Sequence, residues 1–205
     1  LSFLNSALSN GSSRFITLEL GKKESSSLST VFCTVLNAHL LLSLIVVLIA
    51  ETVGLWFVMN KLGIMANRFD AAIFAYHFSI LASVITITQV PYTATIIAHE
   101  RMQIYAYASI FEVVLKLSIL YLLPIVGYDR LETYAVLLFL VQLLIMSIYR
   151  IYCMRQFKET KYKFEFDRTK FKEITSFSSW SLLGNAAHAL TGQGTTILLQ
   201  MFFGP

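Results

Sequence analysis

The sequence contains few charged residues. Only 14% of its 205 residues are Asp, Glu, Lys or Arg, against roughly 25% in an ordinary soluble domain. By contrast, 56% are apolar and the mean hydropathy is +0.66. Several apolar runs approach the ~20 residues that a helix needs to cross a bilayer. The composition therefore argues against a soluble domain and predicts an all-α, polytopic membrane protein.

Residues that would indicate a disulfide, a metal site or a catalytic centre are also scarce. The two cysteines, Cys33 and Cys153, have no metal or disulfide spacing, and we expect both to be reduced structural thiols. The four histidines lie on separate segments, and the chain has neither a phosphate-binding glycine loop nor a G-x-S-x-G motif. We therefore expect no enzyme activity, no catalytic residue, no metal ligand and no cofactor.

A secretion signal is missing as well. The chain has no initiator Met, no charged leader and no cleavage site, so we expect no signal peptide. It begins inside one apolar phrase and ends at Phe203–Gly204–Pro205 just after another. We expect it to be a fragment of a longer protein.

Four apolar runs predict complete membrane spans. They cover residues 29–50, 71–98, 102–126 and 131–153. The first run continues well past the ~30 Å of a hydrocarbon core, so residues 51–62 are expected to form an interfacial extension that includes Trp56. In the second span, Pro91 removes a backbone donor and predicts a kink.

The segments before these spans are expected to be irregular. Residues 1–13 are predicted to be the tail of a helix that breaks at Asn10–Gly11, and residues 14–27 to be a loop or short surface segment. With the four spans they make up a first transmembrane lobe, residues 1–154.

The segments after the spans predict the start of a second lobe. Residues 155–173 are the longest polar stretch and are expected to form a basic cytoplasmic connector between lobes. Its basic and aromatic residues could bind nucleic acid, but beside a membrane span we expect it to lie on anionic lipid instead. Residues 174–205 are predicted to be the truncated first span of the second lobe, with a helix break at residues 192–194.

Lys and Arg are distributed unevenly between alternate loops. One set of loops holds twelve of them, namely Arg14, Lys22, Lys23, Arg101, Arg150, Arg155, Lys158, Lys161, Lys163, Arg168, Lys170 and Lys172. The alternate loops hold only Lys61, Arg68 and Arg130, and Lys116 lies within a span. Because cytoplasmic loops are enriched in Lys and Arg, the first set is predicted to be cytoplasmic.

Two opposite charges lie inside the third span. Glu112 and Lys116 are four residues apart, so they share one helix face with Glu in the more favourable N-terminal position. A charge at this depth is costly and needs a partner or water. The pair is either a structural ion pair or part of a transport cavity, and the spacing does not separate the two.

Uncharged polar residues mark the second and fifth spans. His77 and Gln89 need hydrogen-bond partners in lipid, and the hydroxyl residues around them serve either helix packing or a cavity. The fifth span repeats the pattern with Asn185 and His188. In the first span, His39 is expected to be a satisfied structural residue.

Several phrases in the sequence resemble a known family. They are Arg14–Phe15–Ile16, Glu51–Thr52–Val53–Gly54–Leu55, the run from Val90–Pro91–Tyr92 to Ala98–His99–Glu100, and Met201–Phe202–Phe203–Gly204–Pro205. Together they resemble the bacterial polysaccharide (O-antigen and capsule) flippases, a family similar in fold to the multidrug and toxic compound extrusion (MATE-like) transporters. The resemblance covers nearly the whole chain.

The resemblance implies a function, partners and a location. The expected function is to move undecaprenyl-diphosphate-linked oligosaccharides across the bacterial inner membrane by alternating access. The expected partners are this lipid-linked cargo, membrane lipids and polysaccharide assembly proteins, around a multi-pass transporter that is a monomer and binds no nucleic acid. A wet cavity for such a cargo would draw charge from Arg14 and Lys116, and hydrogen bonds from His77, Gln89, Asn185 and His188.

Two other functions remain open from the sequence. Glu112 partly cancels Lys116, which fits coupling to H⁺ or Na⁺ and leaves a cation-coupled multidrug antiporter as the alternative. A membrane-embedded polysaccharide polymerase or ligase is the alternative of another class. Such enzymes normally have a large outward loop rich in Arg and His, and the outward loops predicted here are short.

Overall fold

The computed structural model is helical throughout the part of the chain that it describes. It describes residues 2–22, 25–61, 68–124, 129–163 and 167–203, with side chains except at residues 2–7, 25–26, 61, 182, 185–186, 188–190 and 192–203. The elements are α1 (Ser2–Gly21), α2 (Ser25–Ile49), the π-helix η1 (Ala50–Gly54), α3 (Leu55–Lys61), α4 (Phe69–Ala98), α5 (Met102–Leu122), α6 (Arg130–Gln156), the 3₁₀-helix η3 (Lys158–Thr160) and α7 (Arg168–Phe203).

Within the described part of the chain, four helical stretches are long and apolar enough to cross a membrane. They are Ser27–Asn60, Phe69–Ala98, Met102–Leu122 and Arg130–Gln156, and each contains most of one predicted span. The outward faces of these helices expose many large apolar side chains, such as Leu44, Leu48 and Leu117. Such a surface would promote aggregation in water, whereas lipid tails accommodate it. These features are compatible with a multi-pass membrane protein.

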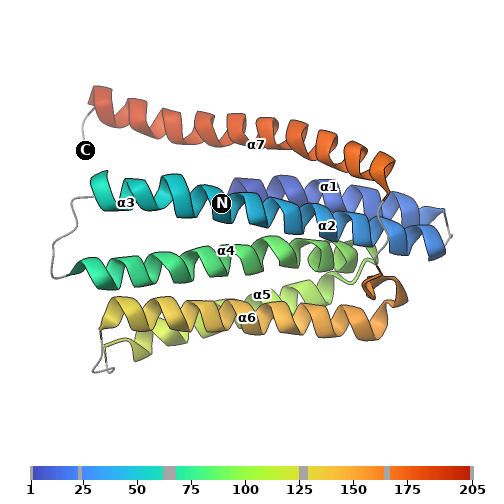
Figure 1. Cartoon of the computed structure of the whole chain (residues 1–205), viewed down its shortest axis with the longest axis horizontal. Helices are drawn as coiled ribbons and strands as arrows, with labels where there is room; N and C mark the ends of the chain where they lie inside the picture. Colours follow the sequence, from blue (N-terminus) through green and yellow to red (C-terminus); the bar gives the residue numbers. More distant parts are fainter. Residues whose placement is uncertain (1, 23–24, 62–67, 125–128, 164–166, 204–205) are drawn as a thin grey trace.

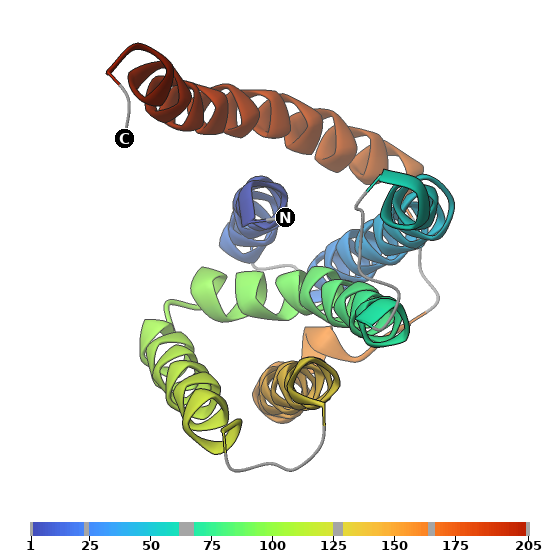
Figure 2. The ribbon, with the colours of Figure 1, turned by 90° about the vertical axis from the view of Figure 1, so that its left-hand side faces the viewer.

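Helix α4 lies at the centre of the bundle. It packs against α1, α2, α5 and α6, while α7 packs against α1 and α2. The end-on view shows α5 and α6 on one side of α4 and α7 on the far side of α1 and α2 (Figure 2). This view also shows α4 changing direction in its C-terminal half, which contains Pro91. The direction change agrees with the predicted effect of proline inside a helix.

Two apolar cores share α2 and α4. The first joins them to α5 and α6 through buried residues that include Phe32, Tyr92, Ile145 and Tyr149. The second joins α1, α2, α4 and α7 through Ile16, Leu28, Val31, Val35, Ala94, Ala98 and Ile174. Small residues such as Ala94 and Ala98 let helices approach closely, as in membrane bundles generally.

The described parts of the loops predicted to be cytoplasmic meet at one end of the bundle, which we call the basic end (residues 19–22, 25–27, 98–102, 155–163 and 167–172; right-hand side of Figure 1). Contacts between distant segments tie this end together. Lys170 Nζ donates to Glu19 Oε1 at 3.1 Å, and the Lys163 amide donates to Cys33 Sγ at 3.3 Å. His99 Nε2 lies 2.6 Å from Glu159 Oε1 and therefore donates to it.

The turn between α4 and α5 closes at this end. Glu100 adopts a left-handed conformation with φ 58°, the Arg101 amide donates to the Ile96 carbonyl at 3.0 Å and the Glu100 amide donates to the Ile97 carbonyl at 2.9 Å. This is the Schellman arrangement that ends many helices. The His99 ring stacks on Phe157 with centroids 4.0 Å apart, which fixes the turn against the segment after α6.

The predicted break at Asn10–Gly11 and the loop at residues 14–27 are corrected by the structure. Helix α1 continues through Gly11 to Gly21. A Cβ atom at position 11 would lie 2.6 Å from Ser178 Oγ of α7. Gly11 therefore permits close packing between two helices and does not end the first of them.

The boundaries after α6 also differ from the prediction. Helix α7 begins at Arg168 and runs unbroken to Phe203, so it takes in the end of the predicted connector and passes through residues 192–194 without the predicted break. Asp167 starts this helix, because its Oδ1 accepts from the amides of Thr169 at 2.8 Å and Lys170 at 3.1 Å. The charge and polarity of residues 168–173 suggested a loop, although a capped amphipathic turn has the same composition.

The predicted extension after the first span is a continuation of that helix through the π-helix η1. The hydroxyl of Tyr76 donates to the Ala50 carbonyl at 2.7 Å, and a Cβ at Gly54 would clash with this hydroxyl oxygen. Gly54 is therefore required for Tyr76 to reach a carbonyl of the π-helix. The contact attaches the end of the first span to α4.

Candidate functional site

A hydrophilic pocket lies between α1, α4 and α5. It has a volume of about 350 Å³ and is lined by Ser9, Asn10, Thr86, Gln89, Val90, Thr93 and Tyr105. All of these except Val90 contain a hydrogen-bonding side-chain group, and none is charged. We call this the polar pocket.

Helix α4 supplies half of the polar lining residues because Thr86, Gln89 and Thr93 recur at helical spacing. The Thr86 hydroxyl donates to the Ala82 carbonyl at 2.8 Å and the Thr93 hydroxyl to the Val90 carbonyl at 3.0 Å. Their oxygens are left as acceptors. Gln89 Oε1 accepts from Gln142 Nε2 of α6 at 3.4 Å, an arrangement that leaves the Gln89 amide nitrogen as a donor.

Helix α5 extends the site toward the opposite end of the bundle. Tyr105, Ser109, Glu112 and Lys116 fall at intervals of four, three and four residues, so they follow one face of this helix. Tyr105 borders the polar pocket and stacks on Tyr149 of α6 with centroids 6.4 Å apart. A stripe of polar and charged groups therefore leads away from the pocket.

The predicted Glu112–Lys116 pair is formed. Lys116 Nζ donates to Glu112 Oε1 at 2.5 Å, and the side chains are 45% and 23% exposed for Lys116 and Glu112 respectively. Neither residue lines the polar pocket. Both groups remain open to whatever surrounds this face of α5.

Arg14 and His77 lie outside the polar pocket. Arg14 is exposed on α1, with its guanidinium carbon 4.4 Å from the centroid of the Phe177 ring of α7. His77 Nδ1 lies 3.1 Å from Glu51 Oε1 of η1, close to the Tyr76 contact. Arg14 therefore lies at the interface of α1 and α7, and His77 lies beside the π-helix. Neither residue lines the pocket that contains Gln89.

Asn185 and His188 belong to helix α7, but the structure does not describe their side chains. Their predicted place in a cavity stays a prediction. Among the described residues, no group of three or more His, Cys, Asp or Glu residues could hold a metal ion.

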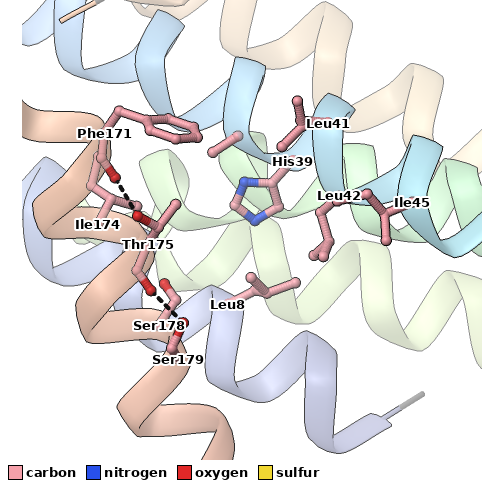
Figure 3. Close-up of a pocket in the computed structure, with 11 residues that line it drawn as sticks. Leu8, His39, Leu41, Leu42, Ile45, Phe171, Ile174, Thr175, Ser178 and Ser179 are labelled. Atoms are coloured by element: carbon pink, nitrogen blue, oxygen red, sulfur yellow. Dashed lines mark hydrogen bonds between the residues drawn. The ribbon is translucent and has the colours of Figure 1, made fainter. Parts of the chain in front are cut away.

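A second cavity, of about 210 Å³, lies between α1, α2 and α7 (Figure 3). His39 projects into it among Leu8, Leu42 and Ser178. The side chain is 2% exposed, and its Nδ1 lies 2.8 Å from the Val35 carbonyl, so Nδ1 must carry the proton. Nε2 has no hydrogen-bond partner in the described part of the chain. The prediction that the polar atoms of His39 are hydrogen-bonded is therefore confirmed for Nδ1 but not for Nε2.

The sequence missed three polar residues of the polar pocket, Ser9, Asn10 and Tyr105. Asn10 was interpreted as part of a helix break because Asn-Gly is a strong turn signal. Tyr105 lies close to a predicted membrane surface, where tyrosines are common for other reasons. The i, i+4, i+7 relation of Tyr105 to Ser109 and Glu112 was the available signal.

Comparisons with known proteins do not identify a family for this chain. No family model matches the chain, and neither the search of curated proteins nor the search of solved structures returned a match.

Proposed function

We propose that this chain forms part of a MATE-like flippase that translocates undecaprenyl-diphosphate-linked oligosaccharides across the bacterial inner membrane. The sequence phrases that resemble the polysaccharide flippases suggest this cargo. The polar pocket is the observation that supports it best. It is a site of amides, hydroxyls and one aromatic ring between α1 and two of the four long apolar helices, α4 and α5.

The chemistry of the polar pocket suits a sugar. Hydroxyl-rich ligands both donate and accept hydrogen bonds, and Gln89 offers a donor while Thr86 and Thr93 offer acceptors. Tyr105 adds an aromatic surface with a polar tip. The pocket lining contains no carboxylate, which an antiporter of cationic drugs would be expected to use.

The α5 stripe suits the anionic part of the same cargo. A diphosphate needs cationic or hydrogen-bonding contacts, and the Lys116 ammonium is close to half exposed. Glu112 holds this ammonium in place and is also the acidic group best placed to take up H⁺ or Na⁺. In this proposal no bond is made or broken, so neither a catalytic residue nor a cofactor is needed.

The polar pocket can be tested with Gln89→Leu in the full-length protein, expressed in a strain that lacks its own copy. We expect surface polysaccharide to fall by about tenfold or more, because the substitution leaves sugar hydroxyls without a partner. The measurement is polysaccharide at the cell surface, normalised to the amount of inserted protein. Ser83→Ala, on the same helix but outside the polar pocket, is the matched control and should export normally.

Two outcomes would count against the proposal in different ways. Normal surface polysaccharide in the strain without the gene would remove the flippase function. Normal export by Gln89→Leu, with export lost in the deletion strain, would remove only the polar pocket.

The role of the α5 pair can be separated from simple structure by exchanging its charges. The double substitution Glu112→Lys with Lys116→Glu keeps an ion pair at the same spacing, at a cost of a few tenths of a kcal/mol. If Lys116 contacts the anionic cargo, the exchanged protein should insert normally but lose export. If the pair only holds the helix, export should continue, and Lys116→Ala alone should be the more harmful change.

A further inference from the structure

A third pocket combines an arginine with an apolar trough. It has a volume of about 430 Å³ and lies between α2, α4, α6 and the segment after η3. Its lining residues are Leu36, Leu40, Thr88, Tyr92, Met146, Arg150 and Tyr162. It uses a different side of α4 from the polar pocket, since Thr88 and Tyr92 line one and Gln89 and Thr93 line the other.

The pocket has a polar tier and an apolar tier because each helix contributes two residues one turn apart. Helix α2 runs away from the basic end, so Leu36 lies nearer to that end than Leu40. Helices α4 and α6 run toward it, so Tyr92 and Arg150 lie nearer to it than Thr88 and Met146. Leu36, Tyr92 and Arg150 therefore share the outer tier with Tyr162, and the arginine and the two tyrosines make this tier polar. Leu40, Met146 and Thr88 form the inner tier, which Leu40 and Met146 make mainly apolar.

Arg150 is the only cation among the lining residues, and it is available to an anion. It is exposed, and among the described residues no ion pair involves it. Among the described residues, its guanidinium carbon lies over the Tyr92 ring, 5.8 Å from the ring centroid. Lys161 and Lys163, both exposed, flank Tyr162 and add positive charge to the outer tier.

Two hydrogen bonds attach residues 162–163, beside the outer tier of this pocket, to α2. The Tyr162 hydroxyl donates to Asn37 Oδ1 at 3.1 Å, and the Lys163 amide is bonded to Cys33 of α2. The segment that supplies the two lysines is therefore attached to α2 and does not depend on a ligand for its position.

We propose that this pocket binds an anionic phospholipid of the leaflet at the basic end, with the phosphate on Arg150 and one acyl chain along Leu40 and Met146. A guanidinium pairs well with phosphate, and anionic lipid is concentrated in the leaflet that faces basic loops. Leu40 is 45% exposed on the outer face of α2, so the inner tier is open to lipid. The inference requires that the chain spans a membrane and does not depend on the transported cargo.

The test uses the full chain in a neutral detergent, titrated with dioleoylphosphatidylglycerol or dioleoylphosphatidylcholine while bound lipid is counted by native mass spectrometry. We expect phosphatidylglycerol to bind in preference to phosphatidylcholine. Arg150→Gln should weaken phosphatidylglycerol binding about fivefold or more. Arg155→Gln is the matched control, because Arg155 is exposed on the same helix outside the pocket, and it should change binding less than twofold.

Two further arms distinguish a lipid from a bare anion. Leu40→Trp keeps Arg150 but fills the inner tier, so it should also weaken phosphatidylglycerol binding. Inorganic phosphate at the same concentrations should neither displace the lipid nor raise the unfolding temperature. Equal effects of Arg150→Gln and Arg155→Gln, no effect of Leu40→Trp, or displacement of the lipid by inorganic phosphate would each overturn the proposal.

Discussion

At pH 7, replacing Glu19 by Gln is expected to lower the free energy of unfolding by about 3 kcal/mol. Glu19 is 6% exposed at the end of α1, outside the four stretches that are long and apolar enough to cross a membrane. It accepts hydrogen bonds from Ser27 of α2, from Lys170 Nζ of α7 at 3.1 Å and from Lys22 Nζ at 3.2 Å. A neutral amide at this position would leave Lys170 without its carboxylate partner.

The size of this effect follows from the pKa of the carboxyl group. The Ser27 hydroxyl, followed by Lys170 and Lys22, lowers the pKa of Glu19 from 4.5 to about 2 despite the opposing effect of burial. A lowered pKa in the folded state means that the stabilisation is fully present above pH 4.5. It is lost progressively as the pH falls from 4.5 toward 2, because the folded state must then be protonated against its preference.

The measurement is thermal unfolding in detergent, followed by circular dichroism between pH 7 and pH 2. The wild-type chain should lose stability across pH 4.5 to 2, whereas Glu19→Gln should begin less stable and show a flatter profile. Glu100→Gln makes the same chemical change at an exposed position of the basic end and should leave the profile close to that of the wild type. Parallel profiles for the wild type and Glu19→Gln would contradict the prediction.

The second large effect concerns the contact between α1 and α7. Gly11→Ala is expected to lower the free energy of unfolding by up to about 2 kcal/mol, which is the usual overpacking cost of about 1–3 kcal/mol less the gain from alanine inside a helix. The new Cβ would lie 2.6 Å from Ser178 Oγ, and Ser178 is buried, so the hydroxyl has little room to move. The normal gain from replacing glycine by alanine inside a helix, about 1 kcal/mol, offsets only part of the overpacking cost.

A second substitution should reverse the sign of that effect. Removing the hydroxyl with Ser178→Ala leaves its Cβ 3.7 Å from the Cβ of position 11, an ordinary van der Waals distance. Gly11→Ala should therefore stabilise the Ser178→Ala chain by up to about 1 kcal/mol, as measured by the same thermal unfolding. Gly184→Ala, in a helix position with open space around it, is the control and should not destabilise either background.

An outcome in which Gly11→Ala stabilises the wild-type chain would show that α1 and α7 are not in close contact at this point. An equal loss in both Ser178 backgrounds would instead place the clash elsewhere, with Phe177 Cδ1 at 3.5 Å as the next neighbour.

The long apolar helices could be predicted because their signal is local. Apolar runs of about 20 residues dictate a span almost regardless of tertiary context, and the predicted 71–98 corresponds to the observed Phe69–Ala98. The error at Asn10–Gly11 has the opposite origin. Its local signal is a turn, but the helix is stabilised by packing against Ser178, which lies far away in sequence.

The candidate site could likewise be predicted where its signal lies within one helix, and not where it depends on contacts between helices. Gln89 could be identified because a carboxamide inside an apolar run requires a partner. Asn10 and Tyr105, which line the same pocket, come from other helices, so no spacing within α4 could reveal that they lie beside Gln89. The ion pair of Glu112 and Lys116 lies within one helix, and its formation followed directly from the four-residue interval.

Neighbouring residues of α4, Thr88 and Gln89, face two different pockets, one beside Arg150 and one beside Tyr105. The helix is therefore a shared partition. A displacement of α4 toward α2 and α6 compresses the Arg150 side and enlarges the Tyr105 side. If a ligand in one pocket favours one position of α4 and a ligand in the other pocket favours the opposite position, each ligand must lower the affinity of the other by the same factor.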